Sequence, residues 1–137
     1  MTQDDPVTEY LAERGVASRL VEGGLSGLAD RWEAIADALE DGYDLTLDDW
    51  LNDMDLRDIL AGALAVAPDA ARTAVSAQVA EADRRFLAGT LPSGAPLWGE
   101  EIAAEEGHDP ATQPWFFRRP KRPGPDLAAE LEDAGLA

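Results

Sequence analysis

The sequence predicts an all-α fold: a small bundle of four to five helices with a Pro-rich C-terminal arm packed on it. Apolar residues recur at helical spacing across residues 6–88, and a glycine or proline follows each such stretch. No stretch alternates apolar and polar residues over a length useful for a strand. Because 137 residues suit one domain, we expect residues 1–89 to form the bundle core and residues 90–137 the arm of that same domain.

Caps and glycines mark the N-terminal helices. Asp5 is a favoured N-cap residue and Pro6 suits the first helical position, so a helix is expected there, ending at Gly15. A short helix is expected over residues 17–22, before a pair of glycines. The clearest helix covers residues 26–41, and its apolar residues recur every three or four positions: Leu25, Leu28, Trp32, Ile35 and Leu39.

Two further helices are expected before residue 90. Thr46 and Asp49 form a weakened capping box at the start of the first one. Its apolar stripe changes frame midway, which predicts a kink or two separate helices near residues 53–55, with an end before Pro68. The last helix of the bundle is expected over residues 69–88, where a glycine follows it.

The arm, residues 90–137, differs in character because it contains seven of the nine prolines. Prolines interrupt long elements, so only short helices are expected here, over residues 97–106 and 126–134. Aromatic side chains in the arm are costly to leave in water, so we expect them to pack on the body or on a partner. They are Trp98, Trp115, Phe116 and Phe117.

The formal net charge of −17, from 28 acidic and 11 basic residues, limits the partners of the chain. It repels phosphate backbones and anionic lipids, so we expect no direct binding of nucleic acid or membrane. The longest apolar run, residues 59–67, is too short to cross a bilayer as a helix. With no basic, apolar leader and no cysteine, the cytoplasm is the expected location.

The densest cluster of charge lies at residues 40–58, where eight carboxylates accompany one cation, Arg57, for a local charge of −7. Like charges three or four residues apart destabilise a helix, so a counter-ion or a basic partner would relieve them. We expect this run to bind a basic protein through six aspartates: Asp44, Asp48, Asp49, Asp53, Asp55 and Asp58. The alternatives are a solvated helix face and a divalent cation site.

Residues 115–123 combine three aromatic rings with four cations. The favoured hypothesis is self-docking, in which the rings fill an apolar groove and the cations pair with the acidic run at residues 48–58. Docking on a partner or on a second copy of the chain is the first alternative, and binding of single-stranded nucleic acid is the second. The candidate partner-binding residues here are Trp115, Phe116, Phe117, Arg118 and Arg119.

Few residues indicate catalysis or a cofactor. The single histidine, His108, lies in a loop without a nucleophile motif, and a surface position is expected for it. The sequence contains no phosphate-binding glycine loop, and no cofactor is predicted. A divalent-metal-dependent helical-bundle enzyme is an alternative, and it would use carboxylates such as Glu33, Asp37, Glu40, Asp41 and Asp44.

The sequence therefore predicts a non-enzymatic protein–protein interaction module that binds a basic protein. An immunity protein, an antitoxin or an inhibitor that covers a nucleic-acid-binding site would fit this description. Charge of this kind speeds encounter with the correct partner more than it adds affinity. A structural or assembly subunit that exchanges its C-terminal arm with another copy is a further alternative.

Overall fold

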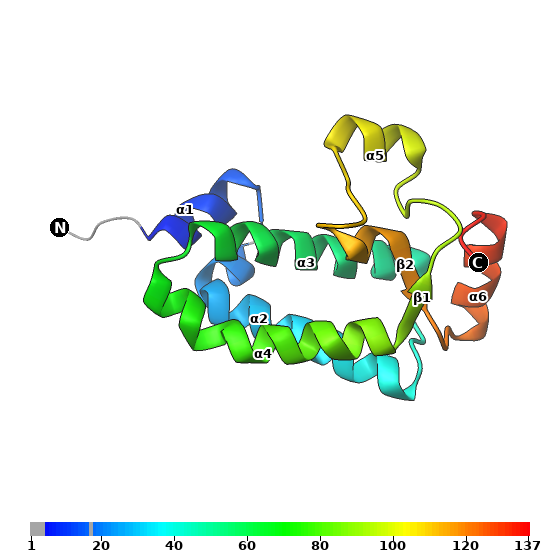
Figure 1. The fold of residues 1–137 in the computed structure, drawn as a ribbon, viewed down its shortest axis with the longest axis horizontal. Helices are drawn as coiled ribbons and strands as arrows, with labels where there is room; N and C mark the ends of the chain where they lie inside the picture. Colours follow the sequence, from blue (N-terminus) through cyan, green and yellow to red (C-terminus); the bar gives the residue numbers. More distant parts are fainter. Residues whose placement is uncertain (1–4, 17) are drawn as a thin grey trace.

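The computed structural model describes the backbone of residues 5–16 and 18–137 and the side chains of residues 5–16 and 22–137. Its α-helical content confirms the all-α class (Figure 1). No helix in the described residues is both long and apolar enough to cross a membrane. The elements, in chain order, are α1 (Pro6–Glu13), α2 (Ser18–Asp41), α3 (Leu47–Val66), α4 (Asp69–Ala88), β1 (Thr90–Pro92), α5 (Glu100–Glu106), the 3-10 helix η1 (Pro114–Phe117), β2 (Arg118–Pro120) and α6 (Pro125–Asp133).

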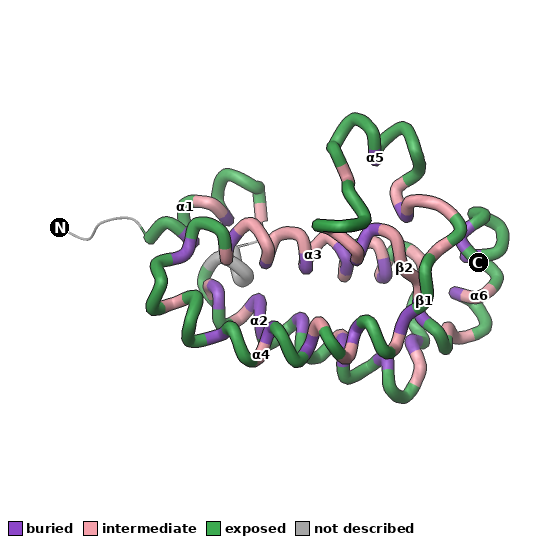
Figure 2. The backbone as a smooth tube through the Cα atoms, in the orientation of Figure 1, coloured by how far each residue is buried: buried purple, intermediate pink, exposed green. Residues whose placement is uncertain are grey.

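Three long helices form the body of the molecule. Helix α2 packs against both α3 and α4, and α1 lies against α2 and α3 (Figure 1). The buried residues line the facing sides of these helices, whereas α5 projects from the body and is mostly exposed (Figure 2). At the centre of the core, the ring of Phe86 lies 5.1 Å from Trp32 and 6.3 Å from Trp50 between ring centroids.

Several helix ends lie where the local sequence signals predict them. Asp5 accepts a hydrogen bond from the backbone N–H of Val7, at 3.4 Å, and so caps α1. The capping box of α3 is complete: the Asp49 amide donates to Thr46 Oγ1 at 3.2 Å, and the Thr46 amide donates to Asp49 Oδ2 at 3.1 Å. Helix α4 has the bounds expected for it, and Gly89 follows its last residue.

One expectation about helix continuity was wrong, and another is confirmed. Helix α3 is one continuous helix, without the kink or division expected near residues 53–55. The change of frame in its apolar stripe marks a change of neighbour, since Trp50 lies against the C-terminal segment and Gly62 lies against Tyr10 of α1. The two helices expected on either side of the glycine pair are present, and they meet within α2 at a break at Gly24 (φ 60°, ψ −156°). Residue 17, the expected start of the short helix, lies outside the described residues.

Two short strands were not foreseen from the sequence. They pair antiparallel, with Leu91 opposite Arg119 at the centre of the register. Each strand has only three residues and contains a proline, so the usual alternating pattern has no room to appear. The pairing brings residues 90–92 and 118–120 together, beside the end of α4.

The C-terminal segment, residues 90–137, adds to the core of the body. Its helix α6 buries Leu127 and Leu131, and η1 buries Trp115 and Phe116. Backbone hydrogen bonds join it to the α2–α3 loop, where the Tyr43 amide donates to the carbonyl of Arg122 at 2.9 Å. The indole of Trp50 also donates to the carbonyl of Arg118, at 3.1 Å.

A buried ion pair connects the long helices to η1. Arg57 of α3 is only 8 % exposed, and its Nε and Nη2 each lie 2.9 Å from a carboxylate oxygen of Asp83 on α4. Trp32 of α2 donates its indole N–H to the same carboxylate at 2.8 Å. The Arg57 guanidinium also lies 4.5 Å from the ring centroid of Trp115, so it makes a cation–π contact with η1.

The break in α2 predicts opposite effects for two adjacent glycines. Gly24 occupies a backbone region that is essentially restricted to glycine, so Gly24→Ala should lower the free energy of unfolding by about 1–3 kcal/mol. Gly23 is helical, its φ is not positive, and a Cβ added there would meet no atom within 4 Å, so Gly23→Ala should be neutral or stabilise by up to about 1 kcal/mol. Urea unfolding of both variants measures the difference, and equal effects would contradict the assigned backbone geometry.

The buried ion pair predicts a large effect of Asp83→Asn. The substitution leaves the charge of Arg57 uncompensated in the core, and because the Asp83 side chain is 36 % exposed we expect a loss of about 2 kcal/mol, less than for a fully buried pair. The matched control is Asp69→Asn, which breaks an Asp–Arg pair whose carboxylate is 97 % exposed and should change stability by less than about 0.5 kcal/mol. Thermal and urea unfolding compare the two variants, and similar losses would show that the Arg57 pair is not structurally important.

Candidate functional site

The six aspartates of the acidic run do not share one surface. Asp44 lies in the loop before α3, and Asp48 lies exposed in its first turn. Asp53 faces a groove between α2 and α3, whereas Asp55 and Asp58 face a cleft between α1, α3 and α5. Residues two apart on a helix point about 200° away from each other, which separates Asp53 from Asp55. The aspartates of α3 therefore face two different surfaces on opposite sides of the helix.

The first surface, which we call the α2–α3 groove, has an apolar floor and a volume of about 320 Å³. Its lining residues are Arg31, Ala34, Ile35, Ala38, Tyr43, Leu45, Asp53 and Leu56. Leu45 is 53 % exposed although it is a large aliphatic side chain. It was not among the residues predicted from the sequence, where its one local signal is an apolar residue between polar neighbours in a short loop. The groove can hold an apolar side chain of a partner beside a carboxylate.

Asp53 is held in position at the edge of this groove. The hydroxyl of Tyr43 donates a hydrogen bond of 2.5 Å to Asp53 Oδ2. Burial raises the pKa of the Asp53 carboxyl, the hydrogen bond from Tyr43 lowers it, and the nearby charge of Asp49 raises it. Burial and the contact with Asp53 also raise the pKa of the Tyr43 hydroxyl. Asp49 is engaged in the helix cap instead, and hydrogen bonds from Thr46 lower the pKa of its carboxyl.

One carboxylate, Asp53, and one cation, Arg31, line the α2–α3 groove, and neither forms an ion pair in the described residues. The ion pairs of the described residues instead involve Asp37, Glu40, Asp58, Asp69, Glu81 and Asp83. No acidic residue from 41 to 53 pairs with an arginine or lysine in the described part of the chain. Of the six aspartates expected to bind a partner, Asp58 alone has such a pair in those residues, with Arg14 at 3.6 Å.

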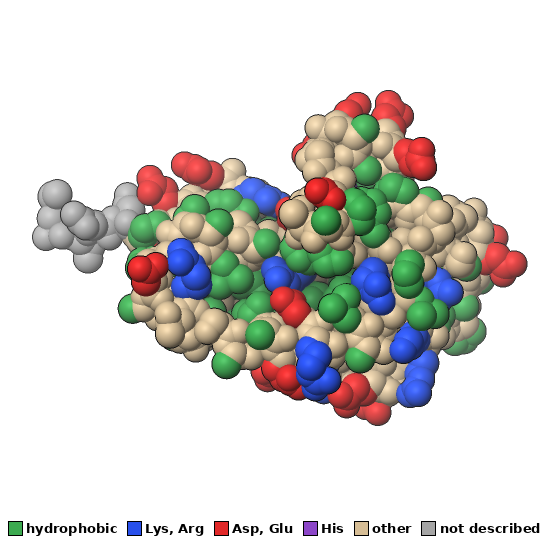
Figure 3. All heavy atoms as spheres, viewed as in Figure 1, with side chains coloured by type: hydrophobic (Ala, Val, Ile, Leu, Met, Phe, Trp, Pro, Cys, Tyr) green, Lys and Arg blue, Asp and Glu red, His purple; other side chains and the backbone are tan. Residues whose placement is uncertain are grey.

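The second surface, which we call the α1–α3–α5 cleft, has a volume of about 590 Å³. It is lined by Arg14, Asp55, Asp58, Trp98, Ile102, Glu106, His108, Gln113 and Phe116. Gln113 Nε2 donates to Asp58 at 2.9 Å, so Asp58 is engaged by both Gln113 and Arg14. The acidic side chains of α5 gather above the body (Figure 3).

Asp55 and His108 are the two unusual titratable groups of the cleft. Asp55 is half-buried, and burial raises the pKa of its carboxyl more than the nearby charge of Arg14 lowers it. The His108 ring stacks on Phe116, with 4.1 Å between ring centroids and 17° between planes. Its Nδ1 is enclosed and has no hydrogen-bond partner among the described residues. The sequence predicted an ordinary surface position for His108. It did not reveal the contact with Phe116, because that contact depends on the fold.

The aromatic and cationic residues of the C-terminal segment contribute to internal packing. Trp115 is 6 % exposed and Phe116 is 1 % exposed, so they belong to the core rather than to a surface that a partner can reach, and Phe117 is half-buried. The expected pairing of the neighbouring cations with residues 48–58 was wrong for the described residues. Arg118 donates to Thr90, at 2.7 Å to the hydroxyl, and Arg119 donates to the carbonyl of Pro120 at 3.2 Å.

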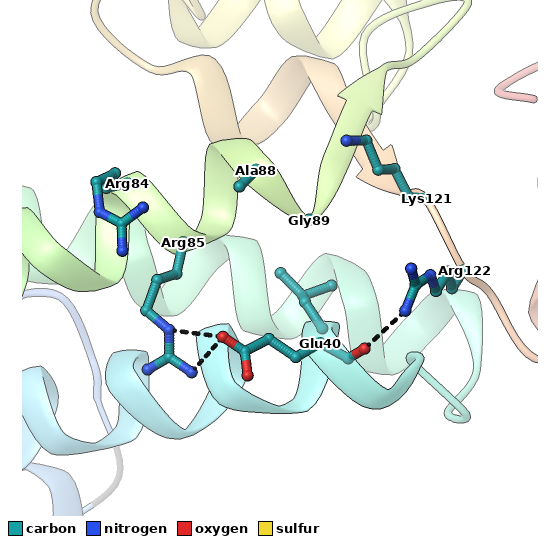
Figure 4. A pocket seen from close by; sticks show the side chains of 8 residues that line it. Glu40, Arg84, Arg85, Ala88, Gly89, Lys121 and Arg122 are labelled. Atoms are coloured by element: carbon teal, nitrogen blue, oxygen red, sulfur yellow. Dashed lines mark hydrogen bonds and ion pairs between the residues drawn. The ribbon is translucent and has the colours of Figure 1, made fainter.

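A third pocket, of about 380 Å³, gathers cations from α4 and the C-terminal segment (Figure 4). Two of its four cations are in ion pairs: Arg85 pairs with Asp37 and Glu40, and Arg84 pairs with Glu81. Arg122 donates to the backbone carbonyl of Glu40 at 3.0 Å. These contacts cross-link α2, α4 and the C-terminal segment.

The described residues contain no group of three or more His, Asp or Glu side chains placed to hold a metal ion. Comparisons with protein-family models, with curated proteins and with solved structures found no match to this chain.

The half-buried carboxylate of the α1–α3–α5 cleft predicts that Asp55→Asn stabilises the free protein at neutral pH. A folded-state pKa above the unfolded value means that ionised Asp55 destabilises the fold, and this effect disappears when both states are protonated. The gain in melting temperature should be largest at pH 7 and should shrink as the pH falls toward 3.8, the ordinary pKa of an aspartate. Thermal unfolding at several pH values measures it, with exposed Glu105→Gln as the control. A variant less stable than the native chain at pH 7 would contradict the prediction.

Proposed function

We propose that this chain is a non-enzymatic protein–protein interaction module whose α2–α3 groove binds a basic segment of a protein partner. One observation supports the proposal above all: an apolar groove with exposed Leu45 is lined by the carboxylate of Asp53, which forms no ion pair in the described residues, and the carboxylates of Asp44 and Asp48 nearby in the sequence form none there either. Partner-binding surfaces commonly combine an apolar centre with a polar, charged rim. Immunity proteins, antitoxins and inhibitors of basic proteins are the kinds of protein that this description fits.

The partner segment would present one apolar side chain flanked by arginines or lysines. The apolar side chain would lie on Leu45 and Ile35, which removes apolar surface on both sides from water. The flanking cations would approach Asp53 in the groove, and Asp44 and Asp48 in the loop before α3 and in its first turn. Asp53 is held by Tyr43, so little side-chain freedom is lost when it accepts a further hydrogen bond.

The charge of the whole chain would assist this encounter. A net charge of −17 attracts a basic partner over a distance that depends on the salt concentration. The same charge repels nucleic acid and anionic lipid.

We also propose that the fold is a helical bundle carrying a Pro-rich arm, residues 90–137, and that the protein acts in the cytoplasm.

The proposal predicts that the acidic residues before α3 and in its first turn control the rate of association. Affinity capture from native cell extract should retain a basic protein on the native chain, and the purified partner should associate more slowly as salt is raised. The double variant Asp44→Asn, Asp48→Asn should reduce its association rate at low salt by about 3- to 10-fold. The variant Leu45→Ala should mainly raise the dissociation rate, by about tenfold.

The matched control is Glu100→Gln, Glu101→Gln, which removes the same number of charges from α5. This variant should associate at nearly the native rate. The proposal fails if the two double variants behave alike, if association is insensitive to salt, or if Leu45→Ala has no effect on binding.

A further inference from the structure

We propose that the α1–α3–α5 cleft is a binding site for a guanidinium group, such as that of an arginine side chain or of a small arginine-like molecule. The cleft lies on the opposite side of α3 from the α2–α3 groove, so this inference goes beyond the proposed function and does not depend on it. Its volume of about 590 Å³ lies within the usual range for small-molecule sites.

The charges of the cleft favour a cation. Three carboxylates line it, Asp55, Asp58 and Glu106, against the one guanidinium of Arg14. Arg14 and Gln113 are both engaged with Asp58. Asp55 and Glu106 therefore remain without an ion pair among the described residues. An anionic ligand would meet these carboxylates inside a protein that is already strongly negative.

Burial makes Asp55 the centre of the site. A half-buried carboxylate without an ion pair is unfavourable, as the raised pKa of Asp55 reflects. A cation bound beside it would favour the ionised form again. Charge-assisted hydrogen bonds between a guanidinium and a carboxylate are among the stronger polar interactions in proteins, because two parallel N–H groups can meet two oxygens.

The walls of the cleft suit a flat cation. Trp98 lines one part of the cleft, and His108 lines another while stacking on Phe116. A guanidinium is planar and stacks on aromatic faces, whereas an ammonium is a compact, strongly hydrated charge. The Nδ1 of His108 is enclosed and has no hydrogen-bond partner among the described residues.

The residues do not favour a metal ion instead. No group of three or more potential ligands is close enough within the described residues. The cleft is also much larger than a bare cation needs, and aromatic side chains contribute to its lining.

The test uses the full chain with Nα-acetyl-arginine amide as the probe and the isosteric, uncharged citrulline analogue as its control. Calorimetry measures affinity, and the Trp98 indole N–H resonance reports the position of binding by NMR. We expect the arginine amide to bind and to shift the Trp98 signal, while the indole signals of the buried Trp32 and Trp50 stay in place. The citrulline analogue should bind at least about tenfold more weakly.

Two substitutions separate the site from general electrostatics. Asp55→Asn should weaken binding by at least about tenfold, whereas Glu105→Gln removes one charge from the same region outside the cleft lining and should change it by less than about twofold. Asp55→Asn is expected to be folded, and circular dichroism checks this. The groove variant Asp44→Asn, Asp48→Asn should bind the probe normally, so failure of either proposal leaves the other standing.

A short peptide, acetyl-Gly-Arg-Gly-amide, distinguishes the two sources of the group. Tighter binding of the peptide than of the amide assigns the site to an arginine of a protein, and equal binding assigns it to a free small molecule. The inference is overturned if the arginine amide does not bind, if the citrulline analogue binds equally well, if the Trp98 signal does not move, or if Asp55→Asn and Glu105→Gln have equal effects.

Discussion

The contact between Arg57 and Asp83 sets the arrangement of the other elements. The guanidinium lies against the rings of Trp32 and Trp115 and hydrogen bonds to a carboxylate that also accepts the Trp32 indole N–H. One side chain of α3 thus contacts α2, α4 and η1 together. A buried charge is strongly destabilising without its partner, so the contact with Asp83 restricts the rotation of α3 about its own axis.

The fixed rotation of α3 explains why one acidic run becomes two different surfaces. With Arg57 directed into the core, Asp53 turns toward α2 and Asp55 turns toward α5. The two carboxylates then acquire different neighbours: a tyrosine hydroxyl holds Asp53, and aromatic and imidazole rings surround Asp55. Asp53 and Asp55 are therefore identical in type and close in sequence, but their positions around α3 give their carboxylates different surroundings.

The sequence predicted those features that depend on nearby residues. The cap at Asp5, the capping box at Thr46 and the ends of α4 follow from contacts within a few positions, so they could be foreseen. The acidic residues proposed to bind a partner were also selected from the sequence, because they are close together in the chain. That Asp53 and Asp55 point in opposite directions follows from helix geometry, but which of them meets the groove and which meets the cleft depends on how α3 packs in the fold. The burial of Trp115 and the exposure of Leu45 likewise depend on the assembled fold.

The positions of the few cations determine which carboxylates form ion pairs and which do not. Four of the arginines that form ion pairs either lie on α4 or pair with a residue of α4: Arg57, Arg72, Arg84 and Arg85. The carboxylates from residue 41 to 53 receive none within the described residues, although self-repulsion there opposes the formation of α3. Helix caps, the core contacts of α3 and the hydrogen bond from Tyr43 to Asp53 offset that repulsion in the free protein. A basic partner would remove it, and this difference in free energy between the free and bound states is what would favour binding at the α2–α3 groove.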